Sequence, residues 1–232
     1  MLGIIASTIF EAAILIEKLS SKKESTIQGK LFFEGRFNNT AATICICGIG
    51  KANAAHGAAV LIERFNPDEV LNIGVAGAFP SSGLSVGDVV VAEREIYGDE
   101  GLATADAFYT MDSLNLPLLS GGKDYFNEFP MSIPDALRDF KNKGAFLTVS
   151  LCTGTLKRAL ELERRFKAVC ENMEGAAVAQ VGISNGTDVC EIRGISNVIE
   201  DRQGEALDKA SIKTAAEAVQ DVFCRFFINS IS

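Results

Sequence analysis

Short apolar segments that alternate with amphipathic segments are the feature that most constrains how this 232-residue chain can fold. Leu2–Ala6 and Ala145–Val149, for example, are apolar at almost every position, whereas apolar residues between such runs recur at helical spacing. Strands that are apolar on both faces are typical of a sheet that helices cover from both sides. The alternation therefore predicts an α/β fold, a three-layer αβα sandwich with a central mixed β-sheet. Because no linker or internal repeat interrupts it, we expect a single domain over residues 1–232.

The same periodicity assigns the individual elements. The expected strands are Leu2–Ala6, Ile27–Phe33, Ala42–Cys47, Glu69–Ile73, Asp88–Ile96, Ala145–Val149, Ala168–Cys170 and Val189–Ile195. The expected helices are Phe10–Leu19, Ala52–Arg64, Thr155–Phe166, Gly175–Val181 and Ile212–Phe227. A hairpin is predicted around Asn38-Asn39, because asparagine tolerates positive φ in a turn. Residues 113–142 are expected to form a surface excursion with a short helix near Pro134–Asn142.

Composition excludes several kinds of partner and site. The net charge of −8 and the pI of about 4.8 make nucleic acid and anionic membranes poor partners for this chain. No run of about 18 apolar residues is present, so no membrane span is expected. The six cysteines are scattered without a CxxC pair, which favours buried, reduced thiols in the cytoplasm. His56 is the single histidine, so no histidine-rich metal site can form.

Two glycine-rich segments follow predicted strands, where ligands bind in sheets of this kind. Gly48–Lys51 opens a helix and could hold an anion, although it is neither a Walker A loop nor a complete GxGxxG motif. Asn72–Ala78 offers small residues that would let the backbone approach a ligand closely. Taken alone, each segment is as compatible with a tight turn or close helix–sheet packing as with a binding site.

Polar residues at other predicted strand ends provide further candidates. Glu171–Ala177 places carboxylates between a strand and a small-residue helix, where an unpaired buried charge would be costly. Arg193–Asn197 ends the last strand with a guanidinium, a hydroxyl and an amide, and Glu11 falls in the first turn of the first helix. A helix-terminal acid or a strand-end cap would explain each of these as well, so each one alone leaves both interpretations open.

Taken together, these blocks resemble the purine nucleoside phosphorylase/nucleosidase superfamily. The resemblance covers nearly the whole chain, and its most specific signature is Met173-Glu174 followed by small residues and a helix. The matching blocks are Gly3-Ile4-Ile5 with Glu11 following, GIGKANAA (48–55), NIGVAGAF (72–79), GDVVVAE (87–93), ENMEGAAVA (171–179) and RGISN (193–197). The resemblance implies the fold predicted above, a purine nucleoside as substrate, a homodimer, and neither cofactor nor metal.

The resemblance also implies a role for individual residues. Glu174 is expected to bind the ribose 2′- and 3′-hydroxyls, Glu11 to position and activate the attacking water, and Asn197 to contact N7 of the leaving purine. These three are the candidate catalytic residues. The expected substrate-binding residues are Val75, Ala76, Gly77, Cys152, Thr153, Asn172, Met173, Arg193 and Ser196.

Two positions depart from the methylthioadenosine/adenosylhomocysteine nucleosidases of this superfamily, which have Asp in place of Asn197 and Ser in place of Val75. An amide can donate to O6 of a 6-oxopurine and accept from N7–H as the base leaves, whereas a protonated Asp suits the amino group of adenine. A mispaired buried polar group costs about 1–3 kcal/mol. Asn197 therefore favours hypoxanthine or guanine over adenine by roughly tenfold to a hundredfold.

The expected nucleophile is water rather than phosphate. A phosphate site in this superfamily would need several arginines and a hydroxyl near the glycine-rich turns. The first turn offers Lys51 and no arginine, Val75 has no hydroxyl, and Glu11 would repel an anion.

Within the superfamily, IYGDEG (96–101) and VSLCTGT (149–155) resemble the futalosine hydrolase branch. That resemblance implies hydrolysis of futalosine to hypoxanthine and dehypoxanthinyl futalosine, on the futalosine route to menaquinone. Arg202 is a candidate cation for the benzoate of that substrate. The alternatives are a nucleosidase for methylthioadenosine, adenosylhomocysteine or aminodeoxyfutalosine, and a phosphate-dependent purine nucleoside phosphorylase.

Overall fold

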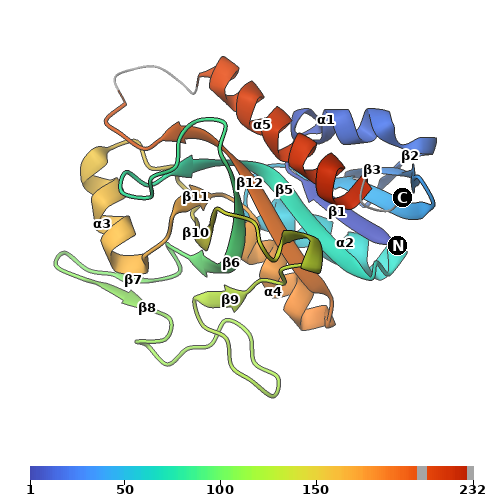
Figure 1. Ribbon diagram of the computed structural model, residues 1–232. Helices are drawn as coiled ribbons and strands as arrows, with labels where there is room; N and C mark the ends of the chain where they lie inside the picture. Colours follow the sequence, from blue (N-terminus) through green and yellow to red (C-terminus); the bar gives the residue numbers. More distant parts are fainter. Residues whose placement is uncertain (203–207, 229–232) are drawn as a thin grey trace.

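A ten-stranded mixed β-sheet forms the centre of the protein in a computed structural model that describes residues 1–202 and 208–228 (Figure 1). The strand order is β11-β10-β6-β12-β5-β1-β4-β3-β2, and the short strand β9 pairs with β6. The strands are β1 (Leu2–Ala6), β2 (Ser20–Ile27), β3 (Lys30–Phe37), β4 (Thr40–Ile46), β5 (Glu69–Ala78), β6 (Val89–Tyr97), β9 (Glu128–Pro130), β10 (Lys143–Thr148), β11 (Cys170–Asn172) and β12 (Asp188–Val198). A separate ribbon joins β7 (Gly101–Ala103) and β8 (Phe108–Thr110).

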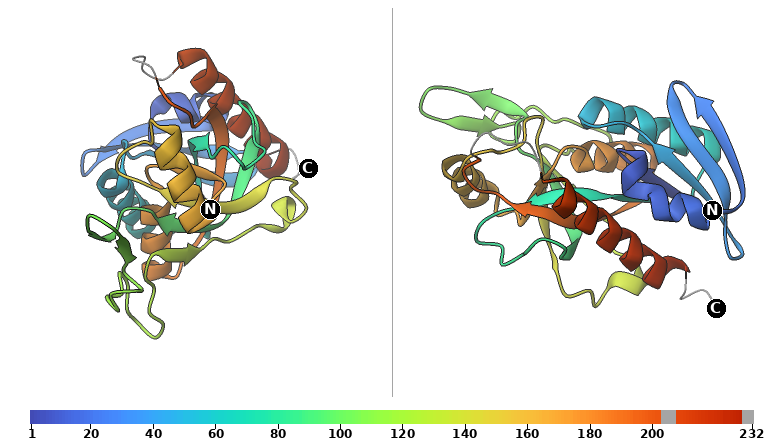
Figure 2. Two further views of the ribbon diagram at one scale, coloured as in Figure 1. Left: turned by 90° about the vertical axis from the view of Figure 1, so that its left-hand side faces the viewer. Right: turned by 90° about the horizontal axis from the view of Figure 1, so that it is seen from above.

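Helices cover both faces of this sheet, so the predicted α/β sandwich with a central mixed sheet is confirmed (Figure 2). Alternate residues of β1 show why: Ile4 packs in the cluster that contains α1 and α5, and Ile5 in the cluster that contains α2 and α4. A third cluster packs α3 against the end of the sheet near β10. The helices are α1 (Ile9–Lys18), α2 (Lys51–Phe65), α3 (Leu156–Phe166), α4 (Gly175–Asn185) and α5 (Lys209–Phe223).

Five strands close into a ring at one end of the sheet. β5 pairs with β12, β12 with β6, β6 with β10, β10 with β11, and β11 returns to β5. The closure occurs at the carboxyl half of β5, where Gly77 is paired on one side with β11 and on the other with β12. Residues that are distant in sequence therefore meet around this half of β5.

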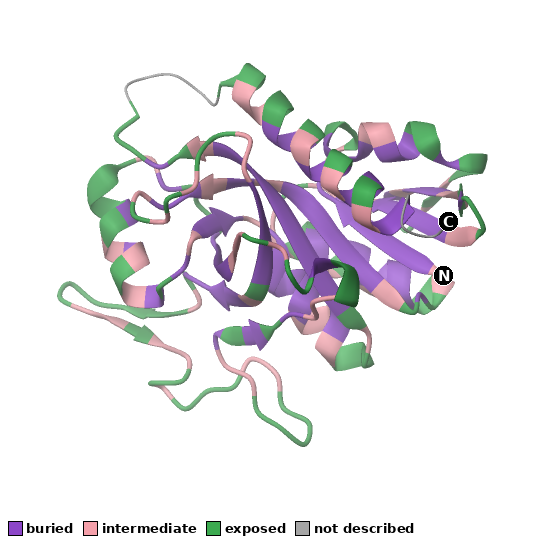
Figure 3. Cartoon of the chain, viewed as in Figure 1, coloured by how far each residue is buried: buried purple, intermediate pink, exposed green. Residues whose placement is uncertain are grey.

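Burial follows the layered arrangement. The central strands are buried along most of their length, whereas the segment from residue 99 to residue 128 is largely exposed (Figure 3). The predicted turn at Asn38 is present, with a φ of 50°, between β3 and β4. Within the described ranges, none of the helices combines the length and the apolar character that crossing a membrane would require.

Several elements differ from the sequence prediction. β2 is not predicted, because its polar sequence SSKKESTI lies mostly exposed at the edge of the sheet and lacks apolar alternation. The predicted strands ending at Ile73 and Ile195 instead continue to Ala78 and Val198, since each finds new partners further along. The segments expected as loops after these two strands are therefore strand residues.

Other corrections concern helix ends and the surface excursion. α5 begins at Lys209, after the Asp208 cap, and gives way to a π-turn at Cys224–Ile228 instead of running regularly to Phe227. The excursion contains β9 and a single 3₁₀ turn at Asp135–Leu137, shorter than the helix expected there. The departures in α5 are at its ends, where local propensity is weakest.

Candidate active site

A cavity of about 390 Å³ opens where β1, β5, β11 and β12 end or close together. Most of the predicted site residues line it: Glu11, Val75, Ala76, Gly77, Cys152, Asn172, Met173, Glu174, Ser196 and Asn197. Arg202, the candidate cation, lines it too. Thr153 and Arg193 do not; both are buried and reach the cavity only through the residues they bind.

Glu11 is fixed at one end of the cavity by the start of α1. Thr8 forms a capping box with it: the Thr8 N–H and hydroxyl donate to Glu11 Oε2 at 3.0 and 2.9 Å. The Val75 N–H donates to Oε1 at 3.1 Å. Burial raises the pKa of Glu11, while Arg193 and these hydrogen bonds oppose the increase. A desolvated carboxylate held by three donors has the fixed orientation that a general base requires.

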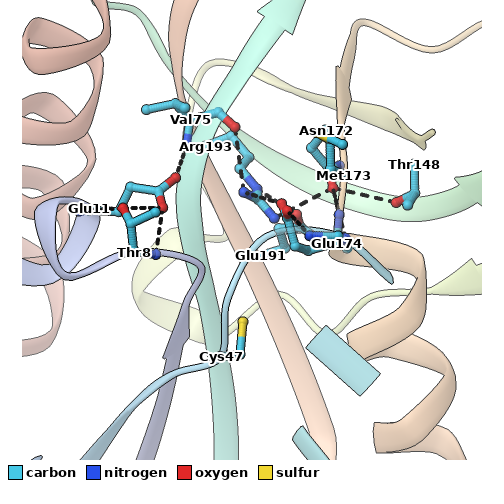
Figure 4. A network of polar contacts seen from close by, with 12 residues as sticks. Thr8, Glu11, Cys47, Val75, Thr148, Asn172, Met173, Glu174, Glu191 and Arg193 are labelled. Atoms are coloured by element: carbon cyan, nitrogen blue, oxygen red, sulfur yellow. Dashed lines mark hydrogen bonds and ion pairs between the residues drawn. The ribbon is translucent and has the colours of Figure 1, made fainter. Parts of the chain in front are cut away.

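Gly74 allows Glu11 and Arg193 to approach the same point of β5. A Cβ at this position would lie 2.8 Å from Glu11 Oε1 and would overlap the Arg193 guanidinium. Arg193 is nearly inaccessible; its Nε donates to Glu191 at 2.7 Å, and its Nη1 lies 3.4 Å from Glu174 Oε2 (Figure 4). Burial alone lowers the pKa of an arginine, but these carboxylates raise that of Arg193 above its ordinary value. Arg193 therefore remains a cation behind the cavity wall.

The first glycine-rich turn is occupied by the protein's own carboxylate. The Gly50 N–H donates to Glu174 Oε1 at 2.9 Å, and Gly50 has a φ of 92°, which glycine adopts readily. Lys51, the cation of this turn, is ion-paired with Asp99 and with Glu100, the latter at 2.8 Å. The donor and the charge that could serve a bound anion are thus both engaged within the chain.

A pair of buried carboxyl groups lies beneath the Glu174 side of the cavity. Glu95 and Glu191 are both fully buried. Burial and the proximity of Glu191 hold the pKa of Glu95 well above its ordinary value, whereas Arg193 opposes the burial effect on the pKa of Glu191. Glu95 therefore keeps its proton while Glu191 pairs with Arg193, which lets two acids share a dry site.

Glu95 of this pair is connected to Glu174 through Asn172. The Asn172 amide donates to Glu95, and its Oδ1 accepts from the N–H groups of Glu174 and Gly175 at 2.8 and 2.7 Å. A Cβ on Gly175 would overlap the carboxyl oxygens of both Glu95 and Glu191. The small residue after Met173-Glu174 is therefore required by the buried acids below it.

Asn197 lies at the other end of the cavity, on a bulge of β12. The register with β5 shifts between Ile195 and Asn197, which turns both Ser196 and Asn197 into the cavity lining. Ser196 Oγ lies 3.0 Å from Asn197 Oδ1 and 3.2 Å from the Ala76 carbonyl oxygen, and its single proton can serve only one of these acceptors at a time. The Asn197 side chain packs over the open side of Gly77, with Nδ2 3.3 Å from where a Cβ would stand. When the Ser196 proton goes to Asn197 Oδ1, the amide keeps its N–H donors for a ligand.

The loop after β10 lies against the same end. The Thr153 N–H and hydroxyl donate to the two carboxylate oxygens of Glu171 at 2.7 and 2.6 Å. Cys152 Sγ lies 3.4 Å from Met173 Sδ, and burial raises the pKa of the Cys152 thiol, which keeps it protonated. Cys152 and Met173 thus form an apolar wall, and Glu171 adds a buried carboxylate to it.

Several lining residues carry no role in the sequence prediction: Ser7, Thr8, Phe10, Ile49, Val149, Glu171 and Ile212. Thr8 has a signal that could have revealed it, because Thr8-Ile9-Phe10-Glu11 has capping-box spacing. Ile49 and Phe10 are exposed apolar residues that only the folded chain brings to one opening.

Comparison with known proteins places this chain in a family. The profile of the phosphorylase superfamily matches residues 2–231. The chain belongs to the phosphorylase superfamily. It is 32% identical over 226 residues to the 5′-methylthioadenosine/S-adenosylhomocysteine nucleosidase of Maridesulfovibrio salexigens, covering 93% of each chain. It is 39% identical over 155 residues to the futalosine hydrolase of Thermus thermophilus, covering 65% of this chain and 66% of the relative.

Solved structures agree with this assignment. The methylthioadenosine/adenosylhomocysteine nucleosidase of Colwellia psychrerythraea, solved in complex with adenine, superposes with a TM-score of 0.80 at 27% identity, covering 97% of this chain and 93% of that one. These phosphorylase-superfamily relatives confirm the predicted superfamily and the enzymatic class of N-glycosyl hydrolase. They support the futalosine branch less well, because the match to the methylthioadenosine/adenosylhomocysteine nucleosidase extends over more of the chain.

Proposed function

We propose that this chain hydrolyses the N-glycosidic bond of a purine nucleoside and that the base it releases is a 6-oxopurine, as in futalosine. In this reaction the bond between C1′ and N9 breaks and its electron pair stays with the purine. Water supplies the hydroxyl that joins C1′ and the proton that leaves with the base. Glu11 accepts the proton of the attacking water, Glu174 holds the ribose hydroxyls, and Asn197 stabilises the leaving base. General base catalysis of this kind contributes roughly 10²–10⁴-fold.

Hydrolysis is favoured over phosphorolysis by how the glycine-rich turn is filled. Its Gly50 N–H already binds Glu174, and Lys51 is paired with Asp99 and Glu100. The buried Glu11 carboxylate lines the same cavity. There it would repel a phosphate dianion, but it can accept a proton from water.

The orientation of Asn197 is the observation that carries the choice of base. Its Oδ1 faces the Ser196 hydroxyl at 3.0 Å, and Nδ2 is the group left to meet a ligand when the Ser196 proton goes to this oxygen rather than to the Ala76 carbonyl. A 6-oxopurine presents two acceptors, O6 and N7, along the edge that this amide would contact. Adenine presents one acceptor and one donor there. An N–H donor can bind either acceptor of the 6-oxopurine edge, but only the one acceptor of the adenine edge.

A second candidate is a nucleosidase for methylthioadenosine or adenosylhomocysteine. The comparisons support it better than the futalosine assignment, since the relative with that name is matched over 93% of this chain rather than 65%. An asparagine can pair with both N6 and N7 of adenine when its carbonyl faces the base. In this chain that pairing would require Asn197 Oδ1 to turn away from Ser196.

Base release from futalosine, inosine and methylthioadenosine, each with and without phosphate, tests both candidates by chromatography. Hypoxanthine from futalosine at a rate independent of phosphate is the expected result. Adenine released in preference from methylthioadenosine would replace the first candidate with the second. Release from inosine that requires phosphate would exclude hydrolysis.

A further inference from the structure

We infer that Glu171 is a second base-reading residue, which accepts the N1–H of a 6-oxopurine while Asn197 contacts the adjoining O6/N7 edge of the same base. This inference rests on the proposed function, whose base preference it would explain from an independent residue. Glu171 lines the cavity and is buried, with 5% of its surface exposed.

The strand register places the two residues on either side of one glycine. Glu171 of β11 is paired with Gly77 of β5, and Asn197 of β12 is paired with the same Gly77 from the other side. Neighbouring strands are about 4.8 Å apart, so the two backbone positions are separated by roughly 10 Å. A bicyclic base that lies in the cavity between the two residues can span this gap with a hydrogen bond at each edge. The space directly beside Gly77 is taken by the side chains of Asn197 and Ile199.

Glu171 retains the capacity to bind a ligand. Thr153 occupies one lone pair on each of its oxygens, at 2.7 and 2.6 Å, and an ionised carboxylate has about two per oxygen. Burial raises the pKa of Glu171, and the hydrogen bonds from Thr153 and the charges of Arg202 and Arg158 oppose that increase. Arg202 also lines the cavity. The carboxylate is thus fixed by its loop and belongs to the cavity lining, with lone pairs left for a ligand.

The chemistry at position 1 separates the two classes of purine. In hypoxanthine and guanine N1 carries a proton and donates, whereas in adenine N1 is an acceptor. A carboxylate can accept from the former but meets the lone pair of the latter with its own. A mispaired buried group of this kind lowers kcat/KM for the wrong base by roughly tenfold to a hundredfold. Glu171 and Asn197 would then select the same base from two adjoining edges.

The simpler alternative is that Glu171 only anchors the loop through Thr153. Glu171→Gln separates the two roles, because a glutamine can still accept from the Thr153 N–H and donate to its hydroxyl. The amide that remains would offer N–H, instead of a carboxylate, toward N1. Thr153→Val is the matched control, since it removes one loop contact and leaves the carboxylate in place.

The experiment measures kcat/KM on 5′-matched nucleosides: methylthioinosine, methylthioadenosine and the 1-methyl derivative of methylthioinosine. The wild type is expected to prefer methylthioinosine and to lose at least tenfold when N1 is methylated. Glu171→Gln is expected to lower the oxo-to-amino ratio by tenfold to a hundredfold, whereas Thr153→Val should weaken both substrates alike. An unchanged ratio in Glu171→Gln would overturn the inference while hypoxanthine release by the wild type leaves the proposed function standing.

Two other outcomes are decisive. A wild type that prefers methylthioadenosine would remove the proposed 6-oxopurine preference and this inference with it. If Glu171→Gln does not fold, the wild-type response to N1 methylation decides alone: equal rates on the methylated and unmethylated inosine derivatives would exclude an acceptor at N1.

Discussion

The two ends of the cavity differ in how their polar groups are satisfied. At the end proposed to hold the ribose, backbone N–H groups donate to Glu11 and Glu174, and Arg193 lies 3.4 Å from Glu174. This network extends to the buried acids Glu95 and Glu191. At the end proposed to hold the base, Asn197 has one hydroxyl partner and Glu171 is tied to a single loop residue. The first end is charged, and its groups hold one another by hydrogen bonds and ion pairs. The second end consists of two polar groups set in an apolar wall.

This difference indicates that the two ends of the cavity have different functions. A braced carboxylate network cannot adapt to different ligands, because every member is fixed by another, and it suits the part of the substrate that all nucleosides share. A polar group with few partners can change identity without disturbing its surroundings, so it can determine which base is accepted. We therefore expect changes at the ribose end to affect every substrate and changes at the base end to affect the ratio between substrates.

The largest expected effect is that of Glu11→Gln, which removes the general base and keeps the shape of the side chain. We expect kcat to fall roughly 10²–10⁴-fold, and by the same factor for 6-oxo- and 6-aminopurine nucleosides. Calorimetric binding of a non-hydrolysable nucleoside analogue should change little. Full activity in this variant would remove Glu11 from the mechanism. A loss confined to one class of base would contradict the proposal that the two ends of the cavity have different functions.

Gly175→Ala is expected to destabilise the ribose end from below. The added methyl overlaps the carboxyl groups of Glu95 and Glu191, which are buried and cannot move into solvent. Overpacking of this kind costs about 1–3 kcal/mol, measurable by urea denaturation. Gly121→Ala is the control, because a Cβ there meets no atom and the backbone has no positive φ. Equal stability of the two variants would mean that the buried acids rearrange freely.

Asn197→Asp should change the base that is accepted with little loss of total activity. A protonated Asp can donate to N7 and accept from the amino group of adenine, so the ratio of kcat/KM should move toward 6-aminopurines by roughly tenfold to a hundredfold. Competition between methylthioinosine and methylthioadenosine measures it directly. If the ratio stays constant, Asn197 does not read the base.

The smallest expected effect is that of Thr8→Val, which removes the hydroxyl that donates to Glu11. This hydrogen bond lowers the pKa of Glu11, so its loss raises that pKa further above the ordinary value. Since the base must be ionised, the acid limb of kcat/KM should shift to higher pH, with up to about a tenfold loss on that limb and little change above it. Thr8→Ser keeps the hydroxyl and should retain the wild-type profile; identical profiles for all three proteins would contradict the role of the cap.

The order of the buried strands and the main helices could be predicted from local sequence, whereas the candidate site residues were predicted from the resemblance to a superfamily. Leu2–Ala6 and Glu69–Ile73 are recognisable because burial on both faces demands continuous apolar residues. β2 could not be recognised, because an exposed edge strand has no apolar face. The continuation of β5 to Ala78 could not be predicted either, since it depends on β11, a partner far away in sequence.

The alternation of elements and the superfamily follow from the amino-acid sequence alone, because apolar periodicity and short motifs such as Met173-Glu174 are local properties. Which groups meet depends on the folded chain. In the fold, Arg193 lies behind the cavity wall and the Gly50 N–H of the glycine-rich turn binds Glu174. Glu171 and Asn197 lie on opposite sides of Gly77. The physical reason is that pairing between strands distant in sequence is set by closure of the ring around β5, which no local pattern encodes.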